Sequence, residues 1–222
     1  PDAGDNLFFY SSAQTLSTND RGDDFAVRKF EIEPGASAYT FAGDRIALSG
    51  TGIFNDSSFL QTFAADISLS GAATAVVANS DVLFSGTLIG SGGLAPRGTS
   101  EVTLNGANAF TGNLSVQCVV NVNTIKTNSS PSAVGRGSRI VLGNGSATGT
   151  LNYTGTGDPW SRNMKIGENT GGAGDTGGGR INNNGTGGAL VITNAQSFTA
   201  NNLAIAPRTL TFGGDNSNAN EM

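Results

Sequence analysis

The stretch that decides the fold is GSGGLAPRGTSEVTLNGANAFTGNLSVQCVVNV, from Gly90 to Val122. Its apolar and polar residues alternate in short runs, which predicts strands over 101–104, 114–116 and 119–122. Gly and Asn stand at the corners between the runs, as in Asn105-Gly106, and these residue types tolerate positive φ. Strands this short cannot bury a core alone, so the pattern predicts that similar units stack above and below this one.

The same stretch resembles the autotransporter-associated β-strand repeat. The residues that carry the resemblance are glycines, apolar residues and one asparagine at the spacing of that repeat: Gly92, Leu94, Leu104, Gly106, Asn108, Phe110, Gly112 and Val116. The sequence departs from the usual pattern at Pro96-Arg97, Ser100-Glu101 and Cys118. The resemblance implies a secreted bacterial right-handed β-solenoid that serves surface adhesion or fibre building. It assigns no catalytic residue.

Composition and spacing favour the same fold. The chain has 222 residues, of which 33 are Gly and 13% are charged. Gly, Asn, Ser and Thr favour turns and strands over helix interiors. Leu-Ser-Gly occurs at 48–50 and again at 69–71, and this separation of 21 residues (69 minus 48) suits one coil of a β-helix. Together with the resemblance, the pattern predicts an all-β, right-handed parallel β-helix of about ten coils with almost no α-helix. A β-sandwich is the alternative that the pattern leaves open.

The chain is expected to form one continuous domain. Residues 1–38 would supply leading strands that cap the first coil, and residues 39–222 would form the coils. A strand is expected at 7–10, and another at 25–33 with a bulge near Arg28-Lys29. Further strands are expected at 39–41, 46–48, 52–54, 59–63, 67–69, 75–77, 82–84, 139–142, 149–153, 164–166, 180–181, 189–192, 203–205 and 210–212.

Several connecting segments have their own expected structure. Turns are expected at Ser49-Gly50 and at Asp158-Pro159-Trp160, and the Gly-rich segment 168–179 is expected to be a mobile excursion from the coil. The chain begins at Pro1 without an initiator Met, which suggests a mature form or a fragment. No cap is recognisable after the last expected strand, so further chain or another molecule is expected to cover that end.

Charge and residue types exclude several functions. The net charge of −5 and the pI near 4.6 disfavour nucleic acid as a partner. No apolar run is long enough for a transmembrane helix. The chain has no His, so it cannot build a Ser-His-Asp triad or a zinc site from Cys and His, and we expect no cofactor. The single Cys118 cannot form an intrachain disulfide.

Carboxylates are the remaining candidates for enzymatic chemistry. Paired carboxylates cleave glycosidic bonds, or hold Ca²⁺ beside a basic residue. The candidate groups are Asp20, Asp23 and Asp24 with Arg21, and the pair Asp56 and Asp66. Ordinary solvated turn carboxylates are the favoured interpretation, because fold analogy is weak support for function.

Three short motifs also have a functional and a structural interpretation. Arg21-Gly22-Asp23 is the tripeptide of integrin ligands, but an ordinary Gly turn is favoured. Gly171–Asp175 is similar to a Ca²⁺-binding repeat, but it is a single copy, and a flexible loop is favoured. Candidate glycan acceptors follow the Asn-x-Ser/Thr pattern at Asn55, Asn113, Asn128, Asn144, Asn152 and Asn184.

Two other groups of side chains are expected to have defined places. Asn108, with Asn105 and Asn113, is expected at inward corners, where its amide would bond the backbone of its own turn and the next coil. Display of these residues for ligand binding is the functional alternative. Trp160 and Tyr153 could stack on sugar rings if they were exposed.

The sequence therefore predicts a secreted, non-enzymatic structural or adhesive surface protein. Its expected partners are further copies of itself, added end to end into an extracellular filament, and a cell-surface or glycan ligand. The alternative is a carbohydrate-binding or polysaccharide-degrading β-helix protein. Open solenoid ends motivate the first hypothesis, and fold analogy with the Trp160 and Tyr153 neighbourhood motivates the second.

Overall fold

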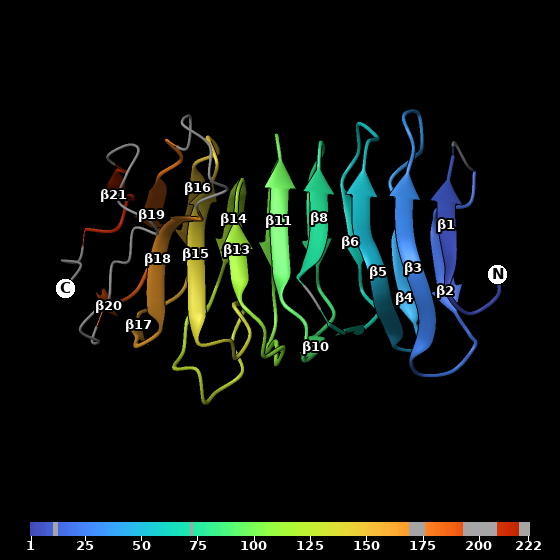
Figure 1. Cartoon of the computed structure of the whole chain (residues 1–222), viewed down its shortest axis with the longest axis horizontal. Helices are drawn as coiled ribbons and strands as arrows, with labels where there is room; N and C mark the ends of the chain where they lie inside the picture. The colour runs from blue at the N-terminus through green and yellow to red at the C-terminus, as the bar shows by residue number, and fades with distance from the viewer. Residues whose placement is uncertain (11–12, 72, 169–175, 193–207, 218–222) are drawn as a thin grey trace.

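The chain folds into a rod of stacked turns made of short strands around a common core. The structure is a computed structural model that describes residues 1–10, 13–71, 73–168, 176–192 and 208–217. Figure 1 shows the turns following one another along the long axis, from β1 at one end to β21 at the other. In the described residues every strand pairing is parallel and no helix occurs. The predicted all-β parallel solenoid is confirmed.

Two long sheets run the length of the rod. The ten-stranded sheet contains β1 (Asp5–Phe9), β3 (Phe25–Ile32), β5 (Ile46–Asn55), β7 (Ile67–Leu69), β8 (Thr74–Ala78), β10 (Leu88–Gly90), β11 (Leu94–Gly98), β13 (Leu114–Val116), β15 (Arg139–Asn144) and β18 (Asn163–Glu168). The nine-stranded sheet contains β2 (Leu16–Asn19), β4 (Thr40–Gly43), β6 (Gln61–Phe63), β9 (Val82–Phe84), β12 (Glu101–Leu104), β14 (Val119–Val122), β16 (Gly149–Tyr153), β19 (Gly179–Asn183) and β21 (Leu210–Gly213). A two-stranded sheet pairs β17 (Asp158–Trp160) with β20 (Leu190–Ile192).

Turn length differs between the two ends of the rod. Registered residues of neighbouring turns are 20 to 24 residues apart in the first part of the chain, as in Leu16 with Thr40 and Leu94 with Thr74. Asn121 and Asn152 are bonded neighbours 31 residues apart, and Asn152 and Asn182 are 30 apart. The solenoid therefore has about seven turns. This number differs somewhat from the expected ten, because that expectation assumed roughly 20 to 25 residues for every turn.

The core consists of columns in which equivalent residues of successive turns lie on one another. Along the nine-stranded sheet, one column holds six buried side chains: Phe41, Phe63, Phe84, Leu104, Val122 and Tyr153. The Phe41 and Phe63 rings stack at 4.6 Å between centroids, and Phe63 and Phe84 at 5.4 Å. Each ring removes apolar area from water and gains from its ring contacts, so this column is a main source of stability.

Most expected strands are present, and two expected features are confirmed in detail. The register shift between Val27 and Lys29 is the bulge expected near Arg28-Lys29. The three strands of the central stretch appear as β12, β13 and β14. In contrast, the turn expected at Ser49-Gly50 is wrong, because β5 continues through it and pairs with different strands before and after.

Two segments with proline are strands that the sequence did not predict. The turn expected at 158–160 is wrong, because β17 pairs with β20 there. Strand β11 was not expected either, and Pro96 lies within it. Pro96 accepts a hydrogen bond from the Gln117 backbone N–H. In a parallel ladder the N–H of the same residue would face that same strand, β13. The missing donor explains why β11 and β13 share a single registered pair, Leu94 with Leu114.

A few expected strand positions are not in strands or lie outside the described residues. Phe59 and Leu60 are exposed, and β6 begins only at Gln61. The strand expected at 203–205, the Gly171–Asp175 motif and most of the Gly-rich segment 168–179 fall outside the described residues.

Glycine is required for different reasons at two positions of the central motif. Gly106 has φ of 118°, as expected for a turn glycine. Gly112 has no positive φ, but a Cβ there would collide with the backbone of Gly92 and Gly93 in the preceding turn. Close approach between turns, rather than turn conformation, therefore requires glycine at this corner.

Candidate docking site at the N-terminal end

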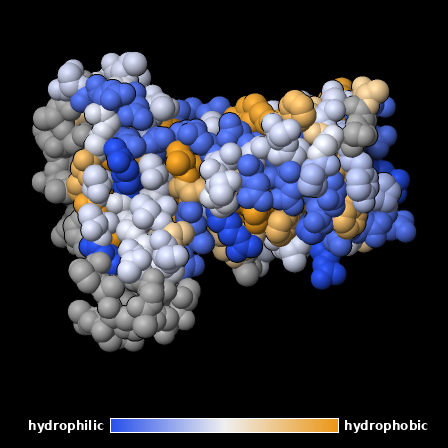
Figure 2. Space-filling view, turned by 90° about the horizontal axis from the view of Figure 1, so that it is seen from above, coloured by the Kyte–Doolittle hydropathy of each residue, from blue (hydrophilic) through white to orange (hydrophobic). Residues whose placement is uncertain are grey.

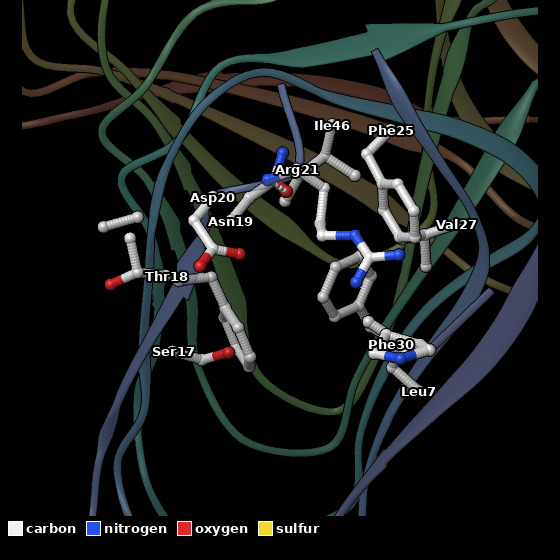
Figure 3. Close-up of a pocket in the computed structure, with 13 residues that line it drawn as sticks. Leu7, Ser17, Thr18, Asn19, Asp20, Arg21, Phe25, Val27, Phe30 and Ile46 are labelled. Atoms are coloured by element: carbon white, nitrogen blue, oxygen red, sulfur yellow. Dashed lines mark hydrogen bonds between the residues drawn. The ribbon is translucent and has the colours of Figure 1, made fainter. Parts of the chain in front are cut away.

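The first turn of the rod leaves its core partly open. Its inward column begins at Ser17 on β2, which lies in register with Phe41 of the next turn. A Ser side chain does not fill the space that Phe41 and Phe63 fill in the following turns. A cavity of about 190 Å³ remains there, lined on the apolar side by Leu7, Val27, Phe30, Phe41 and Ile46 (Figure 3).

Arg21 is the cationic side chain that lines this cavity. Its guanidinium lies 5.5 Å from the centroid of the Phe25 ring, a cation–π distance. Figure 3 shows the Arg21 side chain extending beside Phe25, with Ser17, Thr18 and Asp20 on the opposite side. No ion pair to Arg21 is found within the described residues. The cavity therefore has an apolar floor and a polar, mixed-charge rim.

The strands around the cavity are sheet edges. Within the described residues, β1 pairs only with β3, and β2 pairs only with β4. The Thr15 carbonyl accepts a bond from Thr40 of β4, and the Asn19 carbonyl accepts one from Asp44, directly after β4. Because backbone groups alternate in direction along a parallel ladder, those of Leu16 and Thr18 then point outward. Such outward N–H and C=O groups form a template for another strand.

Large apolar side chains are exposed at the same end. The exposed fractions are 48% for Phe8, 63% for Tyr10 and 55% for Leu16. Figure 2 shows a mostly hydrophilic face along the rod, with apolar residues reaching the N-terminal end. The exposed aromatic and aliphatic groups add apolar contact area to the two open strand edges.

The turn beside the cavity is held by Arg45. Its guanidinium donates two hydrogen bonds to the Asp24 carboxylate at 2.8 and 2.7 Å, and its backbone N–H donates to Asp23 at 3.0 Å. The bonds from Arg45 lower the pKa of Asp24. Asp24 has φ of 62°, the left-handed conformation that Asp tolerates better than most residues. The salt bridge therefore fixes a tight turn at the cavity rim.

The C-terminal end of the rod exposes an aromatic side chain. Phe212 on β21 lies in register with Ile181, whose side chain is buried in the core. Phe212 therefore occupies an inward position, yet 38% of it is exposed. One end of the core has an open cavity, and the other end has an exposed aromatic side chain.

The structure does not gather the carboxylates that the sequence offered for catalysis. Asp23 and Asp24 pair with Arg45 rather than with Arg21. Asp56 accepts a bond from Asn79, and Asp66 from the Thr87 backbone N–H, so each binds a neighbouring turn. Across the described residues no group of His, Cys, Asp or Glu is arranged to hold a metal ion. No helix there has the length and apolar character to cross a membrane.

The residues of the central motif have mostly structural places. Leu94, Leu104, Phe110 and Val116 are buried in the core. Asn108 is also buried, its Oδ1 accepts a bond from the Leu88 N–H at 2.8 Å, and its Nδ2 donates to the Ala133 carbonyl at 2.9 Å.

Asn108 thus joins the turns on both sides, which confirms its inward place and its bond to the next turn. Its other bond is to the preceding turn and not, as was expected, to its own turn. Asn105 and Asn113 are exposed, so the same expectation was wrong for them.

The remaining candidates differ in accessibility. Trp160 and Tyr153 are buried and cannot stack on sugars. Asn55 is buried with its amide bonded to three carbonyls, so it cannot accept a glycan in the folded protein. Asn113 and Asn128 are exposed. Burial raises the pKa of the Cys118 thiol to about 12, which leaves it unreactive near neutral pH.

Comparison with family models, with curated proteins and with solved structures found no significant match for this chain.

Sequence reasoning missed the residues that shape this end of the rod. The strand Leu16–Asn19 is short and largely polar, so it gave no apolar alternation to detect. The importance of Ser17 depends on its register with Phe41, which only strand pairing reveals. The sequence did not indicate the role of Arg45 either, because its partners Asp23 and Asp24 lie a full turn earlier in the chain.

Proposed function

We propose that this chain is a secreted, non-enzymatic structural and adhesive protein of a bacterial cell surface, whose rods stack end to end into an extracellular filament. The observation that carries the proposal is the N-terminal end, where two unpaired strand edges, three exposed apolar side chains and an open core cavity coincide. The resemblance of residues 90–122 to the autotransporter-associated repeat supports the secreted location.

Strand direction supports a head-to-tail contact. All ladders are parallel, so the last turn of one copy presents strands in the same direction as the first turn of the next. Addition of β21 to the β2 edge would continue the nine-stranded sheet, and a head-to-tail contact that does not close into a ring generates fibres. Phe212 continues the column of Ile181 and Leu151, which is one inward position before the column of Phe41 and Tyr153 that Ser17 begins. The inward Phe212 of one copy would therefore fill the Ser17 cavity of the next if the two strands paired with a shift of two residues. An engineered cavity of about 150 Å³ binds benzene, so this cavity has room for an aromatic ring.

Charge favours head-to-tail contact over a contact between two N-terminal ends. Residues 1–56 contain nine acidic and four basic residues, a net charge of −5. Residues 176–222 contain two acidic and two basic residues, a net charge of zero. Two N-terminal ends would therefore repel each other, whereas an N-terminal end meets no net charge at the C-terminal end.

The test removes one outward backbone donor without touching the internal ladder. Thr18→Pro deletes an N–H that faces the open edge, a position where proline is tolerated in sheets. The control is Thr18→Val, which keeps the N–H. Wild type and Thr18→Val are expected to form long fibres with a regular axial repeat in negative-stain electron microscopy, and Thr18→Pro to remain as short rods.

Sedimentation of the purified chain at increasing concentration gives the quantitative result. A wild-type chain that stays monomeric at high concentration, or a Thr18→Pro variant that assembles as well as wild type, overturns the filament. Antibody labelling of intact cells tests the location separately, and label only after lysis contradicts secretion.

A further inference from the structure

The C-terminal turns contain a loop held by a buried cation. Arg162 is 1% exposed and follows β17. Its guanidinium donates to the carbonyls of Lys126 at 2.7 Å, Gly137 at 2.6 Å and Gly135 at 2.7 Å. It also donates to Thr127 O at 3.1 Å and Ser132 Oγ at 3.2 Å. All five acceptors belong to residues 123–138, the long loop between β14 and β15 that Figure 1 shows beside β17.

The acceptors of Arg162 are neutral, so its positive charge is not compensated locally. Burial lowers the pKa of Arg162 to about 10, which still leaves it charged at neutral pH. Asp158 is the carboxylate that lies nearest to Arg162 along the sequence. It accepts hydrogen bonds from the Tyr153 hydroxyl at 2.8 Å and from the Ile125 N–H at 2.9 Å. Asp158 therefore holds other parts of this region and does not bond Arg162.

Exposed cations surround the same loop. Lys126 and Arg136 lie next to the carbonyls that Arg162 holds, and Arg139 begins β15 directly after the loop. All three side chains are exposed, and none has an ion pair within the described part of the chain. No Asp or Glu occurs between Glu101 and Asp158. This surface, defined as Lys126, Arg136 and Arg139, is positive on a protein whose net charge is −5.

We propose that Lys126, Arg136 and Arg139 form a binding surface for an anionic polysaccharide carrying carboxylate or phosphate groups. Arg and Lys side chains pair with both kinds of anion, and an uncompensated buried charge behind them increases the local positive potential. The rigid clasp of Arg162 holds the loop in place, so little backbone entropy is lost on binding. The choice of a surface polysaccharide rests on the proposed extracellular function and gives its adhesive part a ligand.

Nucleic acid is less favoured by the same surface. Single-stranded nucleic acid is held by exposed aromatic side chains that stack on the bases. The large exposed aromatic side chains of the described residues are Phe8, Tyr10, Phe59 and Phe212, none of which lies in the loop or in its flanking strands. The surface thus has charge without stacking platforms.

The experiment compares two double variants with equal loss of charge. Lys126→Gln/Arg136→Gln removes the surface, and Arg28→Gln/Arg97→Gln removes two exposed cations from earlier turns. Binding to polygalacturonate, to a phosphate-bearing mannan, to neutral dextran and to duplex DNA is measured by biolayer interferometry at about 50 and 300 mM salt.

Wild type is expected to bind one or both anionic polysaccharides, and the arm that binds identifies carboxylate or phosphate as the recognised group. Lys126→Gln/Arg136→Gln is expected to weaken this binding at least fivefold, and Arg28→Gln/Arg97→Gln less than twofold. The higher salt concentration is expected to weaken wild-type binding.

Three results overturn the proposal. They are equal losses in the two double variants, no binding of either anionic polysaccharide at low salt, and duplex DNA bound as tightly as the polysaccharides. The measurements are repeated in the Thr18→Pro chain, where filament formation is blocked. Polysaccharide binding that persists there separates the ligand surface from the filament, so that each proposal can fail alone.

Discussion

The N-terminal and C-terminal turns continue the same sheets, but they fill the interior differently. From Phe41 to Phe84, turns of 20 to 22 residues stack aromatic rings in one column. From Asn121 onward, turns of 30 or 31 residues enclose a hydrogen-bonded interior around Tyr153 and Arg162. The extra residues leave the ladder as loops, and their backbone polar groups need partners that a purely apolar core cannot supply.

The comparison teaches that loop insertion changes what the core must do. A short turn has few free carbonyls, so apolar side chains can fill it completely. The loop at 123–138 brings several carbonyls inward, and Arg162 satisfies them with one planar group that carries five N–H donors. The N-terminal half should therefore depend on apolar volume, and the C-terminal half on individual hydrogen bonds.

Removal of the Arg162 guanidinium, whose hydrogen bonds hold the loop 123–138, is expected to have the largest effect on stability. Arg162→Met keeps apolar bulk but leaves buried carbonyls without donors, so we expect a loss of about 4 kcal/mol in the free energy of unfolding. Urea denaturation followed by circular dichroism measures it. The control Arg139→Met alters an exposed cation and should change stability by less than about 0.5 kcal/mol. A loss below about 1 kcal/mol in Arg162→Met would show that the loop does not need the clasp.

The aromatic column gives the next largest effect. Phe63→Leu removes the ring contacts with Phe41 and Phe84 and leaves a small cavity, so we expect a loss of about 2 kcal/mol. The same denaturation assay applies. Ile67→Leu, a volume-conserving change at another buried position, is the control and should cost clearly less. Equal losses in the two variants would contradict a special role for ring stacking.

Two tyrosines test the comparison directly. Tyr153→Phe deletes a hydroxyl that donates to Asp158 and accepts from the Gly157 N–H at 2.9 Å, in the C-terminal interior. Tyr39→Phe deletes one that donates to the Tyr10 carbonyl at 2.9 Å, near the N-terminal surface. We expect losses of about 1.5 and about 0.5 kcal/mol respectively in thermal or urea unfolding. The reverse order would mean that the two halves do not differ in their dependence on polar contacts.

The buried thiol gives an effect that is visible only at alkaline pH. Burial raises the pKa of Cys118 from 9.0 to about 12. Above pH 9 the unfolded chain loses the thiol proton while the folded protein keeps it, so stability falls as pH rises. We expect the stability difference between wild type and Cys118→Ala to shrink by about 1 kcal/mol from pH 8 to pH 10. A constant difference across this range would show that the thiol ionises freely in the folded protein.

The strands with clear alternation could be predicted from sequence. Val82–Phe84, Ile67–Leu69 and Glu101–Leu104 lie where the apolar pattern placed them. Leu94–Gly98 and Asp158–Trp160 were missed. Each contains a proline and becomes a strand only through its parallel neighbour. A local pattern describes one strand, whereas a ladder depends on residues 20 or more positions away.

The candidate sites were harder to predict than the strands. The acid-free run from residue 102 to 157 is visible in the sequence, but the gathering of Lys126 and Arg136 around Arg162 is not. The docking end depends on which edges stay unpaired and on the register of Ser17, and neither follows from composition.

The sequence by itself determined the all-β class, the repetition of short strand units and the inward place of Asn108. It did so because periodicity and turn residues act locally along the chain. Only the tertiary structure decided the number of turns, the partner of each carboxylate, the clasp of Arg162 and the open core at Ser17. These features arise from contacts between successive turns, where a change of one residue in register gives each side chain a different neighbour.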